Sequence, residues 1–153
     1  MLLKWILVVL HIITAAAWFG LGLRLAGQAR SVLNAECNAQ EALAEDRAQS
    51  LWLVHMLIVL TLVFSIGAFI AGGHFVAYGP QYHSAVTLIV FLTIDQLWII
   101  RGGWSALQTA VADGATDALE SAKTRVAIGT GVGHLIWLVL LGLMFVNRFA
   151  AAL

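Results

Sequence analysis

Four histidines are the residues of this chain best suited to chemistry. His11, His55, His83 and His134 each fall in a different apolar stretch of the sequence. An imidazole that faces lipid without a partner is energetically costly, so an ionisable residue inside a membrane span is a functional candidate. One histidine in each of four helices predicts a bundle in which the imidazoles hold haem or a metal ion.

The positions of the histidines give their depth in the membrane. At a rise of about 1.5 Å per residue, His11 lies about 6 Å and His83 about 13 Å outward of the midplane. His134 lies about 5 Å and His55 about 10 Å inward. These outer and inner pairs fall on the two diagonals of a four-helix bundle, where each pair could supply both axial ligands of a haem. The remaining histidine, His74, is expected to be solvated in an outer turn.

Asp95 is the acidic residue that lies inside a predicted span, about 5 Å inward of the midplane. A carboxyl group at this depth is expected to be protonated, or paired with a cation or a histidine N–H. We predict a catalytic role for it, either orienting a ligand imidazole or relaying protons during redox chemistry. A structural hydrogen bond to another helix is the alternative. Asp95 lies about 120° around its helix from His83, so the two cannot both point at the axis of one cavity.

Small and basic residues complete the predicted cofactor site. Gly129 and Gly133 leave the helix surface beside His134 nearly bare, which would let a flat macrocycle approach the backbone. The same Gly-xxx-Gly spacing also packs membrane helices against one another. Arg24 and Arg101 lie near the inner interface, where a guanidinium binds either haem propionates or phospholipid headgroups.

The composition of the chain indicates that these residues lie in a membrane protein. Of the 153 residues, 61% are hydrophobic and 10% are charged, whereas charged residues make up about a quarter of a soluble domain. A span needs about 20 apolar residues, and four such stretches occur, at 2–27, 51–72, 82–101 and 126–148. We therefore predict a single all-α domain over residues 1–153, folded as an integral membrane, up-down-up-down four-helix bundle.

The distribution of charge predicts how the bundle is oriented. The net charge is zero, but most Lys and Arg residues fall on the side of segments 28–50 and 102–125, leaving Lys4 and Arg148 on the other side. Because positive loops stay in the cytoplasm, both termini are expected on the outer side of the inner (cytoplasmic) membrane. Segment 28–50 lacks Pro and Gly, so it is expected to extend the first two helices or to form a surface helix.

The first helix carries the pattern His11-x6-Trp18-Phe19-x4-Arg24-Leu25. It resembles the opening helix of the four-helix, haem-containing protoporphyrinogen oxidases of the HemJ type. It is also similar to the copper-resistance D family, whose helices open with a histidine followed by Trp-x-Gly. The two resemblances imply haem binding and copper handling respectively. In its general layout the chain is similar to transmembrane b-type cytochromes.

Three functions are consistent with the sequence. The first is a b-type cytochrome-like protein with one or two haem b groups that exchanges electrons with the quinone pool, which would make it a haem-dependent membrane oxidoreductase. The second is a copper-handling protein, against which the scarcity of Met and Cys ligands argues. The third is a non-catalytic accessory subunit of a larger respiratory or photosynthetic complex, or a homo-oligomer. A chain with no net charge does not indicate nucleic-acid binding.

Overall fold

The computed structural model describes residues 2–73 and 81–152, and the described chain is almost entirely helical. Its elements, in chain order, are α1 (Leu2–Leu33), α2 (Cys37–Ala71), α4 (Gln81–Ile94), η1 (Asp95–Ile100), α5 (Arg101–Ala112) and α6 (Thr116–Ala152). The elements α4, η1 and α5 follow one another without a break, and we call them together the third span. The predicted outer turn, including His74, lies outside the described residues.

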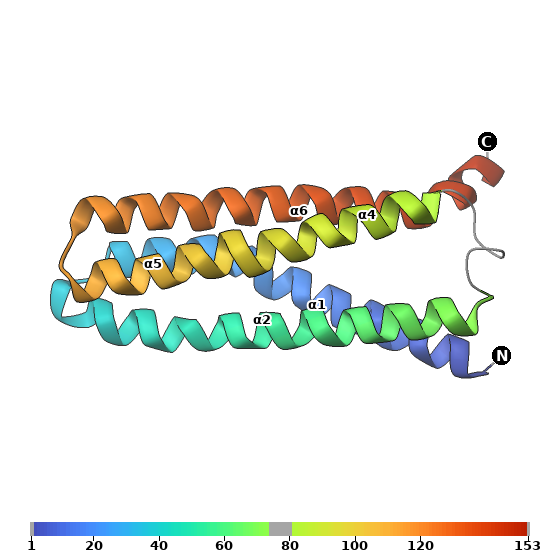
Figure 1. Ribbon diagram of the computed structural model, residues 1–153, viewed down its shortest axis with the longest axis horizontal. Coiled ribbons are helices and arrows are strands. Elements are labelled where there is room, and N and C mark those ends of the chain that lie inside the picture. Colours follow the sequence, from blue (N-terminus) through green and yellow to red (C-terminus); the bar gives the residue numbers. More distant parts are fainter. Residues whose placement is uncertain (1, 74–80, 153) are drawn as a thin grey trace.

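These elements form the predicted four-helix membrane bundle. In the described residues, four helical segments are long and apolar enough to cross a membrane: Leu2–Leu33, Cys37–Ala71, Tyr82–Ala112 and Thr116–Phe145. They alternate in direction, so that both ends of the chain lie at the same end of the bundle (Figure 1). The chain is therefore a multi-pass membrane protein. We call this end the terminal end, and the end with connections 34–36 and 113–115 the loop end.

The helices extend past the predicted spans at the loop end. The expectation for segment 28–50 is confirmed, because α1 continues to Leu33 and α2 begins at Cys37. Within the spans α1 and α2 show almost no apolar stripe, since apolar residues surround the helix on all sides, as expected for helices in lipid. The amphipathic character of α5, in contrast, suits a helix that leaves the hydrocarbon region.

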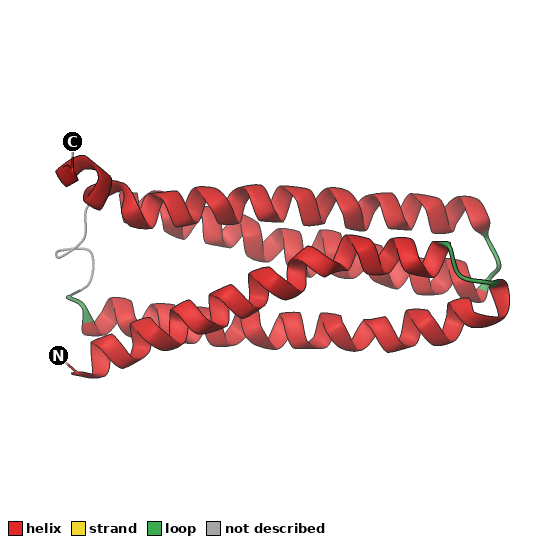
Figure 2. Cartoon of the chain, turned by 180° about the vertical axis from the view of Figure 1, so that it is seen from behind, coloured by secondary structure: helices red, strands yellow, loops and turns green. Residues whose placement is uncertain are grey.

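Packing is tight at the loop end and loose at the terminal end. The residues most deeply buried at the loop end come from all four spans and include Leu25, Val32, Ala44, Leu107 and Val126. At the terminal end, no residue of 2–13, 62–73, 82–91 or 141–145 is buried. The reason is visible in the course of α1, which crosses the bundle obliquely from a position beside α2 towards α6 (Figure 2).

The third span departs from regular α-helix at Asp95–Ile100, where η1 is a π-helix. Such segments are rare, occur mostly as single turns inside α-helices, and are frequent at functional sites. The first two residues of η1, Asp95 and Gln96, are 3% and 6% exposed. The π-helix therefore begins where the span buries a carboxyl and an amide side chain.

Candidate functional site

A cluster of polar side chains lies where η1 packs on α6. We call Asp95, Gln96, Thr130 and His134 the polar node. The Gln96 Nε2 atom donates a hydrogen bond to Asp95 Oδ2 over 3.4 Å. Both side chains lie on Gly133, where an added methyl carbon would be 2.8 Å from Asp95 Oδ2 and 3.0 Å from Gln96 Nε2. Glycine at position 133 is therefore what lets the two polar side chains fit between the helices.

The π-helix brings a second set of side chains onto the same face of α6. Its i→i+5 hydrogen bonds make each turn wider, so residues five apart lie close to the same side of the helix. Asp95 and Ile100 are such a pair. A methyl carbon at Gly129 would be 2.9 Å from Ile100 Cγ1 and 3.4 Å from Asp95 Oδ1. At the end of η1, the Arg125 Nη2 atom donates to the Trp98 carbonyl over 3.1 Å. The glycine face predicted to be bare is thus covered by η1.

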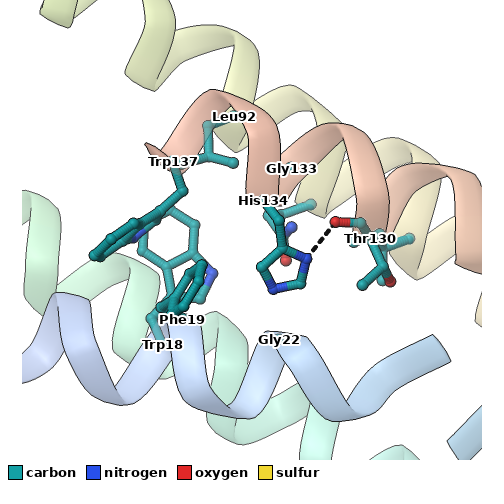
Figure 3. A pocket seen from close by; sticks show the side chains of 10 residues that line it. Trp18, Phe19, Gly22, Leu92, Thr130, Gly133, His134 and Trp137 are labelled. Atoms are coloured by element: carbon teal, nitrogen blue, oxygen red, sulfur yellow. Dashed lines mark hydrogen bonds between the residues drawn. The ribbon is translucent and has the colours of Figure 1, made fainter. Parts of the chain in front are cut away.

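The imidazole of His134 lies between α6 and α1. Its Nδ1 atom is 2.5 Å from the Thr130 carbonyl oxygen. A carbonyl only accepts, so Nδ1 carries a hydrogen, and in the neutral ring Nε2 keeps a lone pair. Figure 3 shows the ring directed at Gly22 of α1, with the aromatic side chains of Phe19 and Trp137 beside it. The Phe19 ring meets the His134 ring edge-on at 5.0 Å and stacks on Trp137 at 4.3 Å.

A small cavity adjoins the polar node. Its volume is about 20 Å³, and its wall includes Gln96, Thr130 and His134 together with the aromatic residues Trp18, Phe19 and Trp137 (Figure 3). We call it the node cavity. The Gln96 Oε1 and Thr130 Oγ1 atoms are buried and have no hydrogen-bond partner among the described residues.

A larger cavity lies beside His11, towards the terminal end. It has a volume of about 120 Å³, and residues from all four spans line it. We call it the ring cavity. The surface that it presents is apolar, with His11 and Thr61 as the polar residues in its wall. Trp18, Leu92 and Trp137 line both cavities and so form the partition between them.

His11 and Thr61 are joined across the interface between α1 and α2. The His11 Nδ1 atom is 3.3 Å from the Thr61 carbonyl oxygen, which assigns a hydrogen to Nδ1 and, in the neutral ring, a lone pair to Nε2. The Thr61 side chain is 1% exposed, and its hydroxyl has no partner among the described residues. An unpaired buried hydroxyl is costly, but this one does not reach the surface of the ring cavity, which is entirely apolar.

The other predicted site residues lie away from both cavities. His55 hydrogen bonds with the backbone of Leu51 and interacts electrostatically with Arg101, while its Nε2 atom is buried without a partner in the described structure. His83 is exposed, as are Arg24 and Arg101. Within the described part of the chain, neither cavity is lined by two of the four histidines, so the predicted diagonal pairs do not share either cavity, and their haem ligation stays a prediction.

The donor atoms of this chain suit haem, but the space beside them does not. His11, His55 and His134 each hold one ring nitrogen on the backbone, which orients the other for a metal. The ring cavity of about 120 Å³, however, is near the size of an engineered cavity of about 150 Å³ that accepts benzene. A porphyrin, with its four pyrrole rings, is far larger. Across the described residues, no three metal-binding side chains form a cluster.

The positions of the histidines in the sequence do not predict two other residues of the site, Gln96 and Thr61. Gln96 carries an available signal, since a strongly polar side chain directly follows Asp95 in an otherwise apolar span. Thr61 gives almost none, because threonine in a membrane helix commonly bonds to its own backbone, as Thr93 does with Ile89. The unpaired hydroxyl of Thr61 emerges only in the folded bundle.

No family model, curated protein or solved structure matches this chain. The function is therefore argued from the site itself.

The glycine face of α6 can be tested with a matched pair of substitutions. Gly133→Ala places a methyl group against Asp95 and Gln96, whereas Gly131 has no described atom within 4 Å of an added methyl. Overpacking costs about 1–3 kcal/mol, while alanine in a helix gains about 1 kcal/mol over glycine. We expect Gly133→Ala to lower the midpoint of thermal unfolding in detergent, and Gly131→Ala to leave it unchanged or raise it. Equal effects of the two substitutions would contradict the packing of η1 on Gly133.

Proposed function

We propose that this chain binds a quinone-class molecule from the bilayer in the ring cavity. The ligand class is a six-membered ring with carbonyl or hydroxyl groups and an apolar tail. One observation carries the proposal: an apolar cavity of about 120 Å³ is formed jointly by all four spans, beside a histidine and an unpaired threonine hydroxyl.

The size and the walls of the cavity favour one flat ring. Its volume approaches that of a cavity known to accept benzene, about 150 Å³. Trp18 and Trp137 supply aromatic side chains in the wall, and aromatic pairs contribute about 0.5–1.5 kcal/mol beyond the area that they bury. An aliphatic chain alone would gain no such contribution.

The two polar residues of the wall match the two oxidation states of a quinone. The hydroxyl of Thr61 is buried and unpaired, and a rotation of its side chain towards the cavity would let it donate to a quinone carbonyl. The Nε2 atom of His11 has a lone pair and can accept from a quinol hydroxyl, because Nδ1 is engaged with the Thr61 carbonyl. Binding is therefore expected for both forms.

The route into the cavity runs through the lipid-facing surface. Ile12, Leu141 and Met144 line the cavity and are also exposed. They lie in the terminal part of the bundle, where packing is loose. A ligand dissolved in the bilayer can therefore enter sideways and leave its apolar tail among the lipids.

Quenching of tryptophan fluorescence can test the proposal, because Trp18 and Trp137 line the cavity. The detergent-solubilised protein is titrated with a short-chain benzoquinone. Ala15→Phe fills the cavity and should abolish saturable quenching. Ala17→Phe, on the exposed side of the same helix, should leave it intact. Thr61→Val removes one hydrogen bond and should weaken binding about tenfold, which corresponds to about 1.4 kcal/mol. Identical titrations of the two phenylalanine variants would contradict binding in the ring cavity.

A second candidate is a haem b protein of membrane electron transfer, for which quinone would be the redox partner. The backbone-anchored ring nitrogens of His11, His55 and His134 support it, because this arrangement is usual for metal-ligating histidines. Haem would supply one-electron chemistry, but the helices would have to separate to admit it. No observation on the described residues favours copper handling or an accessory-subunit role.

The visible spectrum of the purified protein tests this second candidate. It predicts a Soret band that shifts on reduction with dithionite. The band should be lost in His11→Leu, whose side chain lines the ring cavity, and kept in His83→Leu, whose side chain is exposed. A protein purified from haem-supplied cells without a Soret band contradicts haem binding and leaves quinone binding as the function to test.

The orientation that we propose places both termini on the outer side of the inner membrane. The basic residues at the loop end support it, among them Arg30, Arg47 and Lys123.

Cys37 provides a native reporter for this orientation, because it is the only cysteine and is exposed at the loop end. A membrane-impermeant maleimide should label it only after the cells are permeabilised. In a Cys37→Ser background, Ala71→Cys at the terminal end should be labelled in intact cells. The reverse pattern would show that the termini face the cytoplasm.

A further inference from the structure

Three exposed arginines lie around the bundle where its spans approach the loop end, and we call Arg24, Arg101 and Arg125 the arginine belt. We propose that the belt binds the phosphate groups of anionic phospholipids, with Arg125 as its preorganised member. None of the three arginines lines the node cavity or the ring cavity. Lipid binding at the belt therefore does not depend on the proposed binding of a quinone.

Contacts between the spans place the arginines at one level of the bundle. The Gln28 Nε2 atom of α1 donates to the Ser50 hydroxyl of α2 over 3.1 Å. About one turn from this bond, towards the terminal end, lie Arg24 on α1 and His55 on α2. His55 in turn interacts electrostatically with Arg101, the first residue of α5. The first three spans are thus in register at the belt.

The guanidinium of Arg125 adds α6 to the same level, because it is held on the backbone of the third span. Its Nη2 atom donates to the Trp98 carbonyl over 3.1 Å. A methyl carbon added at Gly102 would be 2.9 Å from the same Nη2 atom, so glycine at this position leaves the space that the guanidinium occupies. A guanidinium has five N–H donors in a fixed fork. The donors that remain suit a phosphate, which arginine binds through two parallel hydrogen bonds.

The protein supplies no carboxylate to the belt. Among the described residues, none of the three arginines forms an ion pair. Every acidic residue except Asp95 falls in segments 36–46 and 113–120, on the loop-end side of the belt. The basic side chains that do have carboxylate partners also lie on that side, in the pairs Arg47–Asp46 and Lys123–Glu120. The positive charge of the belt is therefore left for an anion outside the protein.

Exposed tryptophans place the lipid headgroups near the belt. Trp98 is 73% exposed and Trp52 is 63% exposed, and tryptophan is enriched where a membrane meets water. Basic pockets between membrane helices bind anionic headgroups on the cytoplasmic side of a membrane. Ile128 lies one turn from Arg125 towards the terminal end and is also exposed. A phospholipid supplies both a phosphate for the guanidinium and acyl chains for this apolar surface, whereas a free phosphate supplies only the first.

Quenching by brominated phospholipids tests the proposal, because bromine on an acyl chain quenches a nearby tryptophan and Trp98 lies beside Arg125. The full chain is reconstituted in phosphatidylcholine vesicles with a rising fraction of dibromo-phosphatidylglycerol, and in parallel with dibromo-phosphatidylcholine. The signal of Trp98 is the difference from the Trp98→Phe protein. We expect phosphatidylglycerol to be preferred over phosphatidylcholine around Trp98. Equal quenching by the two lipids would overturn the proposal.

A matched pair of substitutions assigns the preference to the belt. Arg125→Gln should lower the preference for phosphatidylglycerol about fivefold, which is the effect of one arginine near a membrane surface. Arg30→Gln should leave it unchanged, because Arg30 is also exposed on α1 but lies beyond the belt towards the loop end. Equal losses in the two variants would contradict a site at Arg125. The unmodified protein keeps the proposal testable even if Arg125→Gln does not fold.

Inorganic phosphate distinguishes a lipid site from a site for a free anion. Added to the same vesicles at matched ionic strength, it should leave the quenching by dibromo-phosphatidylglycerol unchanged. Relief of the quenching by phosphate, but not by sodium chloride, would show that the belt takes the free anion, which overturns the assignment to a lipid.

Discussion

The close approach of η1 to the glycine face of α6 is the contact on which the rest of the structure depends. A polar side chain in a membrane span needs a partner inside the protein, because lipid offers none. Gly129 and Gly133 leave the space in which Asp95 and Gln96 meet that need. The π-helix then brings Ile100 onto the same surface, so apolar packing closes over the polar pair. One pair of glycines thus permits both the buried acidic residue and the tight helix contact.

The helices pack closely on the loop-end side of this contact and loosely on the terminal-end side. Towards the loop end the four spans share a continuous core that includes Leu25, Leu107 and Val126. Towards the terminal end α1 turns away from α6, and no residue is buried in the described outer segments. Trp18 and Trp137 lie at the transition and separate the node cavity from the ring cavity. The bundle is therefore closely packed where it holds polar groups and loosely packed around the ring cavity.

The four spans and their directions could be predicted from the sequence because backbone satisfaction in lipid leaves few alternatives. The directions in which the histidine side chains point could not be predicted from the sequence. A helix that is apolar on all sides has no stripe to show which face is inward, so the sequence predicted depths for His83 and His11 but did not show that His83 is exposed and that His11 lies in a cavity wall. The π-helix was equally inaccessible, since no residue pattern in Asp95–Ile100 marks it. Asp95 was identified because a carboxylic acid is rare in a span.

The account makes one central claim, that the terminal half of the bundle encloses a ring-sized site for a quinone-class ligand. Photolabelling with an azido-benzoquinone followed by peptide mapping tests it most directly. The account predicts saturable labelling at residues that line the ring cavity, such as Ile12, Ala16 and Met144, and protection by unlabelled quinone. Labelling spread over lipid-facing residues outside the cavity, such as Val59 and Val63, without protection by unlabelled quinone, would contradict it.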